Sequence, residues 1–152
     1  LYEKVSADYL RVYVPKGSEL LEADGHTLET VSPPINYAKA NFALDAQVQE
    51  IENSITVHES GTHIFEESGK AVFGNWVYVS PGESATVRYV YKLPWKVGEG
   101  WEKEYAMYVQ KQPGAFARFT AAVSMQDGSL VEGVMPQDAP LEQDLEYRAT
   151  IH

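Results

Sequence analysis

The histidines offer the first chemistry to consider. His58 and His63 flank the turn dipeptide Gly61-Thr62, and three glutamates lie nearby in the sequence: Glu59, Glu66 and Glu67. Two imidazoles and one carboxylate can hold a zinc ion. The spacing of five residues matches no common metal signature, and the surrounding turn is polar. Surface histidines are therefore the simpler interpretation, and we predict no metal ligand here.

Serine and carboxylate chemistry has no clear motif either. The sequence has no Gly-x-Ser-x-Gly elbow, and its Ser60-Gly61 and Ser68-Gly69 pairs are turn dipeptides. Acidic residues occur in close pairs: Glu66 with Glu67, Glu102 with Glu104 and Glu142 with Asp144. A glycosidase needs two carboxyl groups at a fixed separation across a cleft, which closeness in sequence does not provide. A calcium role for Asp127 or Asp144 stays open, although no Asp-x-Asp-x-Asp-Gly loop is present. We expect no catalytic residue, no enzyme activity and no cofactor.

Aromatic residues carry the strongest functional signal. Six of them lie between residues 89 and 108, among them Tyr91, Trp95 and Trp101. Residues 95–101 are predicted to form a loop between two strands. Tryptophans on such a loop can stack on a sugar ring or anchor a partner protein. The alternative is that they cap the hydrophobic core. We take Trp95, Trp101 and Tyr91 as the candidate ligand-binding residues.

Strands dominate the expected structure. Apolar and polar residues alternate with a period of two in residues 9–14, 38–44, 76–79, 85–91, 105–109, 119–125 and 145–151. The turn Ser80-Pro81-Gly82-Glu83 separates two of these runs and predicts a β-hairpin. Turns about every ten residues indicate an all-β fold, an antiparallel immunoglobulin-like β-sandwich, as one domain over residues 1–152.

One stretch is also compatible with a helix. Leu44, Val48, Ile51 and Ile55 share a helix face, and Asp45 is placed to cap its start. Ile55 and Val57 suit the start of a strand equally well, so helix and strand stay open for residues 44–55. Residues 135–144 are expected to form an exposed connection before the last strand.

Composition limits the partners. The 152 residues include 12 basic and 22 acidic side chains, a net charge of -10, and no cysteine. Such a charge repels a nucleic acid backbone, so we predict no nucleic-acid binding. The absence of cysteine removes disulfides and thiolate chemistry. No apolar run approaches the roughly 20 residues of a membrane span, so we expect no insertion by this segment.

Five phrases in order resemble a known family. They are Tyr-Leu-Arg-Val-Tyr-Val-Pro-Lys-Gly-Ser-Glu-Leu at 9–20, Gly-Lys-Ala-Val-Phe-Gly at 69–74, Val-Ser-Pro-Gly-Glu-Ser at 79–84, Tyr-Lys-Leu-Pro at 91–94 and Val-Gln-Lys-Gln-Pro-Gly at 109–114. This order resembles the C-terminal β-rich segment of a bacterial envelope family of unknown function (domain of unknown function number four thousand and twelve). The resemblance covers roughly residues 9–115. It implies a large membrane-anchored parent protein, mostly outside the cell, and no established activity.

Together these features predict a non-catalytic extracellular domain with a structural or interaction role in a bacterial cell-envelope protein. We expect the chain to be a piece of that longer protein. Its partners would be other envelope proteins or cell-surface polysaccharide, and its oligomeric state stays open. The alternatives are a carbohydrate-binding module that uses the loop tryptophans, or an accessory domain of an envelope polysaccharide enzyme.

Overall fold

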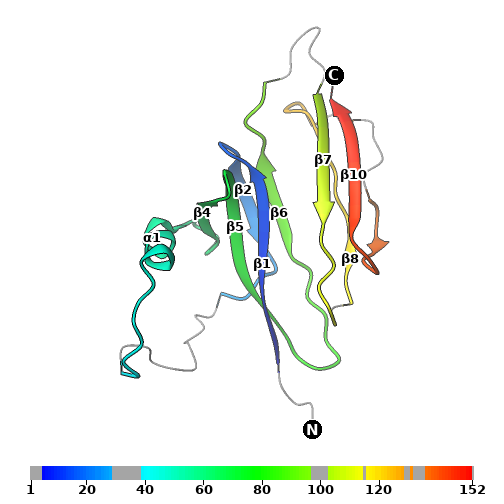
Figure 1. The fold of residues 1–152 in the computed structure, drawn as a ribbon. Coiled ribbons are helices and arrows are strands. Elements are labelled where there is room, and N and C mark those ends of the chain that lie inside the picture. The colour runs from blue at the N-terminus through cyan, green and yellow to red at the C-terminus, as the bar shows by residue number, and fades with distance from the viewer. Residues whose placement is uncertain are drawn as a thin grey trace. The chain divides into compact units, whose positions relative to one another are not determined.

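The fold is all-β with one short helix. A computed structural model of the chain describes residues 5–28, 39–96, 103–114, 116–128, 131 and 136–151. Every strand pair is antiparallel, which confirms the predicted fold class (Figure 1). The chain divides into two compact units, residues 1–94 and 95–152, and each is described by itself. The immunoglobulin-like arrangement and the single domain stay predictions.

Unit 1 contains two sheets. The larger has the strand order β1-β5-β4-β3, with bounds β1 Ser6–Pro15, β5 Lys70–Val79, β4 His63–Glu67 and β3 Thr56–Val57. The smaller pairs β2 (Glu19–Asp24) with β6 (Arg88–Lys92). The alternation of residues 9–14 predicted a strand, and these residues lie in β1, which pairs with β5 over its full length.

The core of unit 1 lies between these two sheets. Val14, Ala71 and Phe73 from the larger sheet pack with Leu20 from β2, and all four are buried. Partly buried side chains of both sheets surround them: Val12, Ala23, Ile64, Tyr89 and Tyr91. A register shift between Leu20 and Glu22 marks a β-bulge at Leu21. The extra residue lets both Leu20 and Ala23 face the core although three positions separate them.

The predicted hairpin of residues 76–91 is wrong. The turn itself is present, since the Glu83 N–H donates to the Ser80 carbonyl at 3.0 Å and Gly82 has a φ of 82°. Strand β5, however, pairs with β1 and β4, whereas β6 pairs with β2. The turn therefore carries the chain from one layer to the other, and its two flanking strands share a core instead of a ladder.

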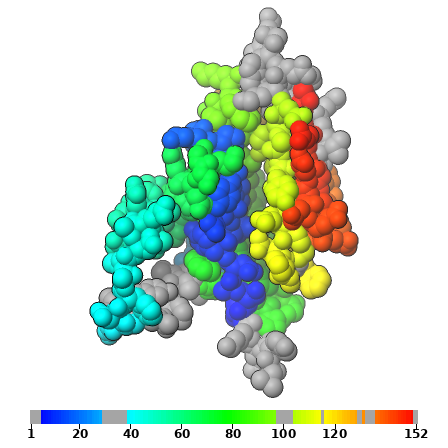
Figure 2. All heavy atoms as spheres, viewed as in Figure 1, coloured from blue at the N-terminus to red at the C-terminus, as the bar shows by residue number. Residues whose placement is uncertain are grey.

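The open choice between helix and strand for residues 44–55 is decided for the helix, and a short strand begins only at Thr56. Helix α1 covers Ala46–Ser54, and the Asp45 carboxylate accepts from the backbone N–H groups of Gln47 and Val48 at 2.8 and 3.0 Å. None of its residues is buried, and in Figure 2 its cyan atoms lie at the side of unit 1. The strand predicted at 38–44 is wrong over residues 39–44, which form a turn and irregular chain. Asn41 there has a φ of 58°, which no strand accepts.

The described residues of unit 2 include two strand pairs. Strand β7 (Lys103–Val109) pairs with β10 (Leu145–Ile151), and both were predicted. Strand β8 is only Arg118–Phe119, so the strand predicted at 119–125 is mostly wrong. Its partner β9 (Ala139–Pro140) lies within the predicted connection 135–144, which is a second correction. Proline at this position fits a short edge strand, because it has no N–H for a ladder.

Candidate functional site

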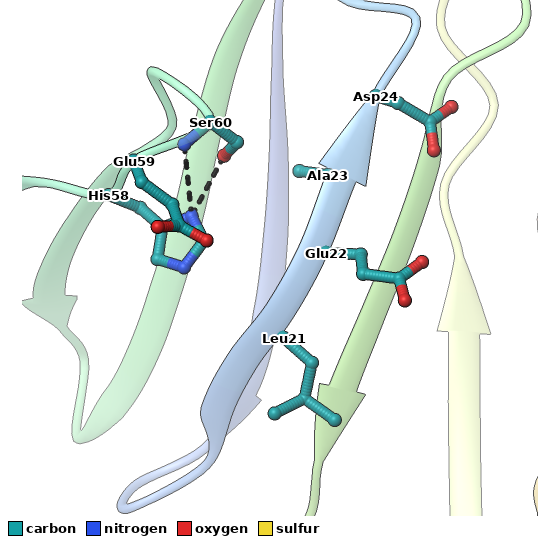
Figure 3. A pocket seen from close by; sticks show the side chains of 7 residues that line it. All are labelled: Leu21, Glu22, Ala23, Asp24, His58, Glu59 and Ser60. Carbon is teal, nitrogen blue, oxygen red and sulfur yellow. Dashed lines mark hydrogen bonds between the residues drawn. The ribbon is translucent and has the colours of Figure 1, made fainter.

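A shallow pocket opens on unit 1 between β2 and the turn that joins β3 to β4. Its volume is about 490 Å³, and its lining residues are Leu21, Glu22, Ala23, Asp24, His58, Glu59 and Ser60. Figure 3 shows Ala23 pointing toward the turn, while Glu22 and Asp24 point the other way. The walls therefore come from two segments that lie far apart in the sequence.

The carboxylates of the β2 wall are held by an arginine on β6. Arg88 donates to Glu22 at 2.6 Å and to Asp24 at 3.5 Å. The hydrogen bond that Arg88 donates to Glu22 is the main cause that raises the pKa of Arg88. This ion pair ties β2 to its ladder partner β6, so the two acids act first as cross-strand contacts.

The other wall is a hairpin turn with a dense polar network. The Gly61 N–H donates to the His58 carbonyl at 2.8 Å, and the His58 N–H donates to the Thr62 carbonyl at 2.9 Å. Gly61 has a φ of 85°, as a three-residue hairpin loop with a left-handed residue requires. The Ser60 hydroxyl lies 2.9 Å from Nδ1 of His58 and 2.8 Å from the hydroxyl of Thr62 (Figure 3 shows the first contact).

A second histidine reaches this turn from the segment after β2. Nε2 of His26 lies 2.8 Å from the carbonyl oxygen of Ser60. Nδ1 of His26 is buried and has no hydrogen-bond partner in the described part of the chain. No local pattern in the sequence indicates a role for His26, because its partner is 34 residues away.

The network has little of what serine catalysis requires. The Ser60 N–H, which an oxyanion hole would use, donates to Nδ1 of His58 at 3.3 Å. The Gly61 N–H is already used within the turn. These bonds make Ser60 a part of the turn, and the contact with His58 is a local one between residues i and i+2.

His63, the other histidine of the predicted pair, points elsewhere. Its Nδ1 lies 3.2 Å from the Tyr9 hydroxyl on β1. The Tyr9 ring also packs against Trp76, with ring centroids 5.1 Å apart, and burial is the main cause that raises the pKa of Tyr9. Within the described residues, no three His, Asp or Glu side chains are grouped so as to hold a metal ion.

The predicted aromatic site divides between the two units. Tyr91 belongs to unit 1, where its ring packs on Phe73 with centroids 5.9 Å apart. Trp95 belongs to unit 2, is half-buried, and meets buried Tyr105 edge-on at 6.1 Å. Trp101 lies outside the described residues. The structure thus gives Tyr91 and Trp95 packing partners within their own units.

Comparisons with known proteins give no relatives. No family model, no curated protein and no solved structure matches the chain. The resemblance to the envelope family stays a prediction. Over the described ranges, no helix is long and apolar enough to cross a membrane.

Proposed function

We propose that this chain is a non-catalytic structural and interaction domain on the extracellular side of a bacterial envelope protein. The proposal rests on the ion pairs that the arginine side chains form. All four arginines of the sequence pair with carboxylates, three of them across neighbouring segments of the sheets: Arg11 with Glu67, Arg88 with Glu22, Arg118 with Asp138 and Arg148 with Glu104.

This arrangement suits a scaffold. The arginines link strands instead of facing an anionic ligand, and a surplus of carboxylates is left over for solvent and partners. With 22 acidic against 12 basic residues, the surface favours solubility and basic or neutral partners. Other envelope proteins and cell-surface polysaccharide are the partners we propose.

Carbohydrate binding is the second candidate. Trp95 supports it, because the edge-on contact with Tyr105 fixes the orientation of a tryptophan ring that is still partly exposed. A fixed aromatic ring can stack on a pyranose at a small cost in side-chain entropy. Trp101 is the other tryptophan that we propose for this site.

The test is cosedimentation of the purified chain with insoluble cell-wall material and envelope polysaccharide. The variants are Trp95→Ala/Trp101→Ala and, as a matched control, Phe116→Ala, whose ring is fully exposed in the same unit. Saturable binding that the double variant loses and the control keeps would establish the carbohydrate site. No pelleting of any protein would leave the protein-interaction role. Release of soluble sugar fragments would overturn the non-catalytic proposal.

A further inference from the structure

The hydrogen bonds of the β3–β4 turn fix the protonation of His58. The Ser60 N–H can only donate, and it donates to Nδ1 of His58 at 3.3 Å. Nδ1 therefore carries no proton. The Ser60 hydroxyl, 2.9 Å from the same nitrogen, must donate as well, and it then accepts from the hydroxyl of Thr62 at 2.8 Å. The chain Thr62 to Ser60 to His58 thus requires a neutral imidazole with its proton on Nε2.

His26 is held in the same tautomer by a different route. A carbonyl oxygen only accepts, so Nε2 of His26 carries the proton that bonds Ser60 at 2.8 Å. Its Nδ1 is buried without a partner among the described residues. A proton on Nδ1 would therefore bury an N–H group without an acceptor, which costs free energy. Both imidazoles are compatible with this arrangement only while they are neutral.

We propose that His26, Ser60 and His58 form a pH-sensitive latch. It holds the β3–β4 turn to the segment after β2 through the contact between His26 and the Ser60 carbonyl. Protonation of His58 removes the acceptor of the Ser60 N–H, and protonation of His26 adds an N–H without an acceptor among the described residues.

The neighbouring charges do not reverse this expectation. From β2, Glu22 and Asp24 point away from the His58 ring and pair with Arg88 of β6. From the turn itself, Glu59 is exposed, so water and salt screen its charge. From β4, His63 bonds the Tyr9 hydroxyl. The described carboxylates near the His58 ring are therefore either paired with Arg88 or exposed to solvent.

The test compares amide hydrogen exchange of the whole chain at pH 7.5 and pH 5.5, expressed as protection factors so that intrinsic rates cancel. We expect protection of the His58 and Gly61 amides to fall about tenfold or more at the lower pH. In His26→Gln/His58→Asn, Gln supplies a donor for the Ser60 carbonyl and Asn supplies an acceptor for Ser60. We expect this variant to keep its protection at both pH values. His63→Gln is the matched control and should behave like the wild type.

Two outcomes would overturn the latch. One is unchanged protection of the turn in the wild type. The other is an equal loss of protection in the double variant, which would assign the pH dependence to other groups. If the double variant is unfolded at pH 7.5 by circular dichroism, the nitrogen chemical shifts of His26 and His58 in the wild type decide instead. Protonated Nδ1 on both rings at pH 7.5 would refute the proposal.

Discussion

The tip of the Tyr9 side chain lies directly over Gly74. A Cβ on Gly74 would stand 2.3 Å from the Tyr9 hydroxyl oxygen and 2.8 Å from Cζ. Gly74 is the register partner of both Arg11 on β1 and His63 on β4, so it sits in the middle of the sheet. The missing side chain lets Tyr9 cross β5 and reach Nδ1 of His63. A strand glycine here marks a close approach by an aromatic side chain.

Gly74→Ala is expected to lower the free energy of unfolding by about 1 kcal/mol. The new methyl group displaces Tyr9, which loses its hydrogen bond to His63 and part of its contact with Trp76. The smaller backbone entropy of the unfolded alanine chain offsets part of this loss. Urea denaturation measures the change, with Tyr9→Ala and the double variant alongside. Since Tyr9→Ala removes the clash, Gly74→Ala should cost less in that background; equal costs would contradict the explanation.

A side chain is tolerated less at position 25 than at the other turn glycines. It has a φ of 76°, and a Cβ there would lie 1.8 Å from the backbone oxygen of Thr86. Gly69 has a similar φ of 73°, but a Cβ there would meet nothing within 4 Å. We expect Gly69→Ala to cost about 1 kcal/mol for the left-handed conformation alone. Gly25→Ala should cost several times as much, because the backbone near Thr86 has to move. Similar melting temperatures for the two variants would contradict this prediction.

The Asp45 cap predicts a local effect. Asp45→Ala removes the acceptor for two N–H groups at the start of α1, and such a cap contributes about 1 kcal/mol to its helix. Because α1 has no buried residue, the loss should stay within the helix and hardly change global unfolding. Hydrogen exchange of residues 47–54 should become faster, and Asp45→Asn should restore slow exchange. A fall of several degrees in the melting temperature would show that α1 is coupled to the core.

The sequence predicted a strand well where apolar and polar residues alternate within that strand. Residues 9–14 and 145–151 alternate clearly, and both lie in paired strands. The hairpin of residues 76–91 failed because the partner of β6 is β2, which comes more than 60 residues earlier in the chain. Alternation tells which residues share a face, and it does not tell which strand is the neighbour. The bulge at Leu21 likewise left no signal in the residue types.

The candidate site shows the same limit. His58 and Ser60 could be read as parts of a polar turn, since they are close in sequence. His26 could not be associated with them, because a fold must bring its ring to the Ser60 carbonyl. Tyr91 is one of the predicted ligand-binding residues, yet a strand position opposite Leu20 places it against the core. The second sheet determines which face of a strand is buried. The alternation of residues within one strand carries no information about that second sheet.

Acid is expected to weaken unit 2 through Asp144. The hydrogen bonds from the Tyr108 hydroxyl and then from the Lys111 N–H are the main causes that lower the pKa of Asp144 below 3.8. A lowered pKa stabilises the folded state above the unfolded pKa, and this contribution disappears as the pH falls through the lower folded value. Asp144→Asn should therefore reduce the dependence of the melting temperature on pH between pH 5 and pH 2. Glu142→Gln, which removes the same charge two residues away, is the control. An equal reduction in both variants would assign the effect to net charge.

A hydrogen bond between side chains joins the two layers of unit 1. The Tyr89 hydroxyl on β6 donates to Oδ1 of Asn75 on β5 at 2.8 Å, and Asn75 is only 4% exposed. Burial is the main cause that raises the pKa of Tyr89 far above its usual value of 10.0, so the phenol stays protonated and remains a donor. Tyr89→Phe should cost about 1–3 kcal/mol, since it leaves a buried amide oxygen without a donor.

The matched variant for this pair is Asn75→Leu, tested alone and together with Tyr89→Phe. Asn75→Leu alone leaves the Tyr89 hydroxyl without its acceptor and should also destabilise the unit. The double variant removes both polar groups and should recover part of the loss, because no unsatisfied group then lies between the layers. Urea denaturation of the four proteins gives the coupling energy as a double-mutant cycle. Additive losses would mean that the bond contributes nothing between the layers, and the packing of Val14, Leu20 and Phe73 would then hold the layers together by itself.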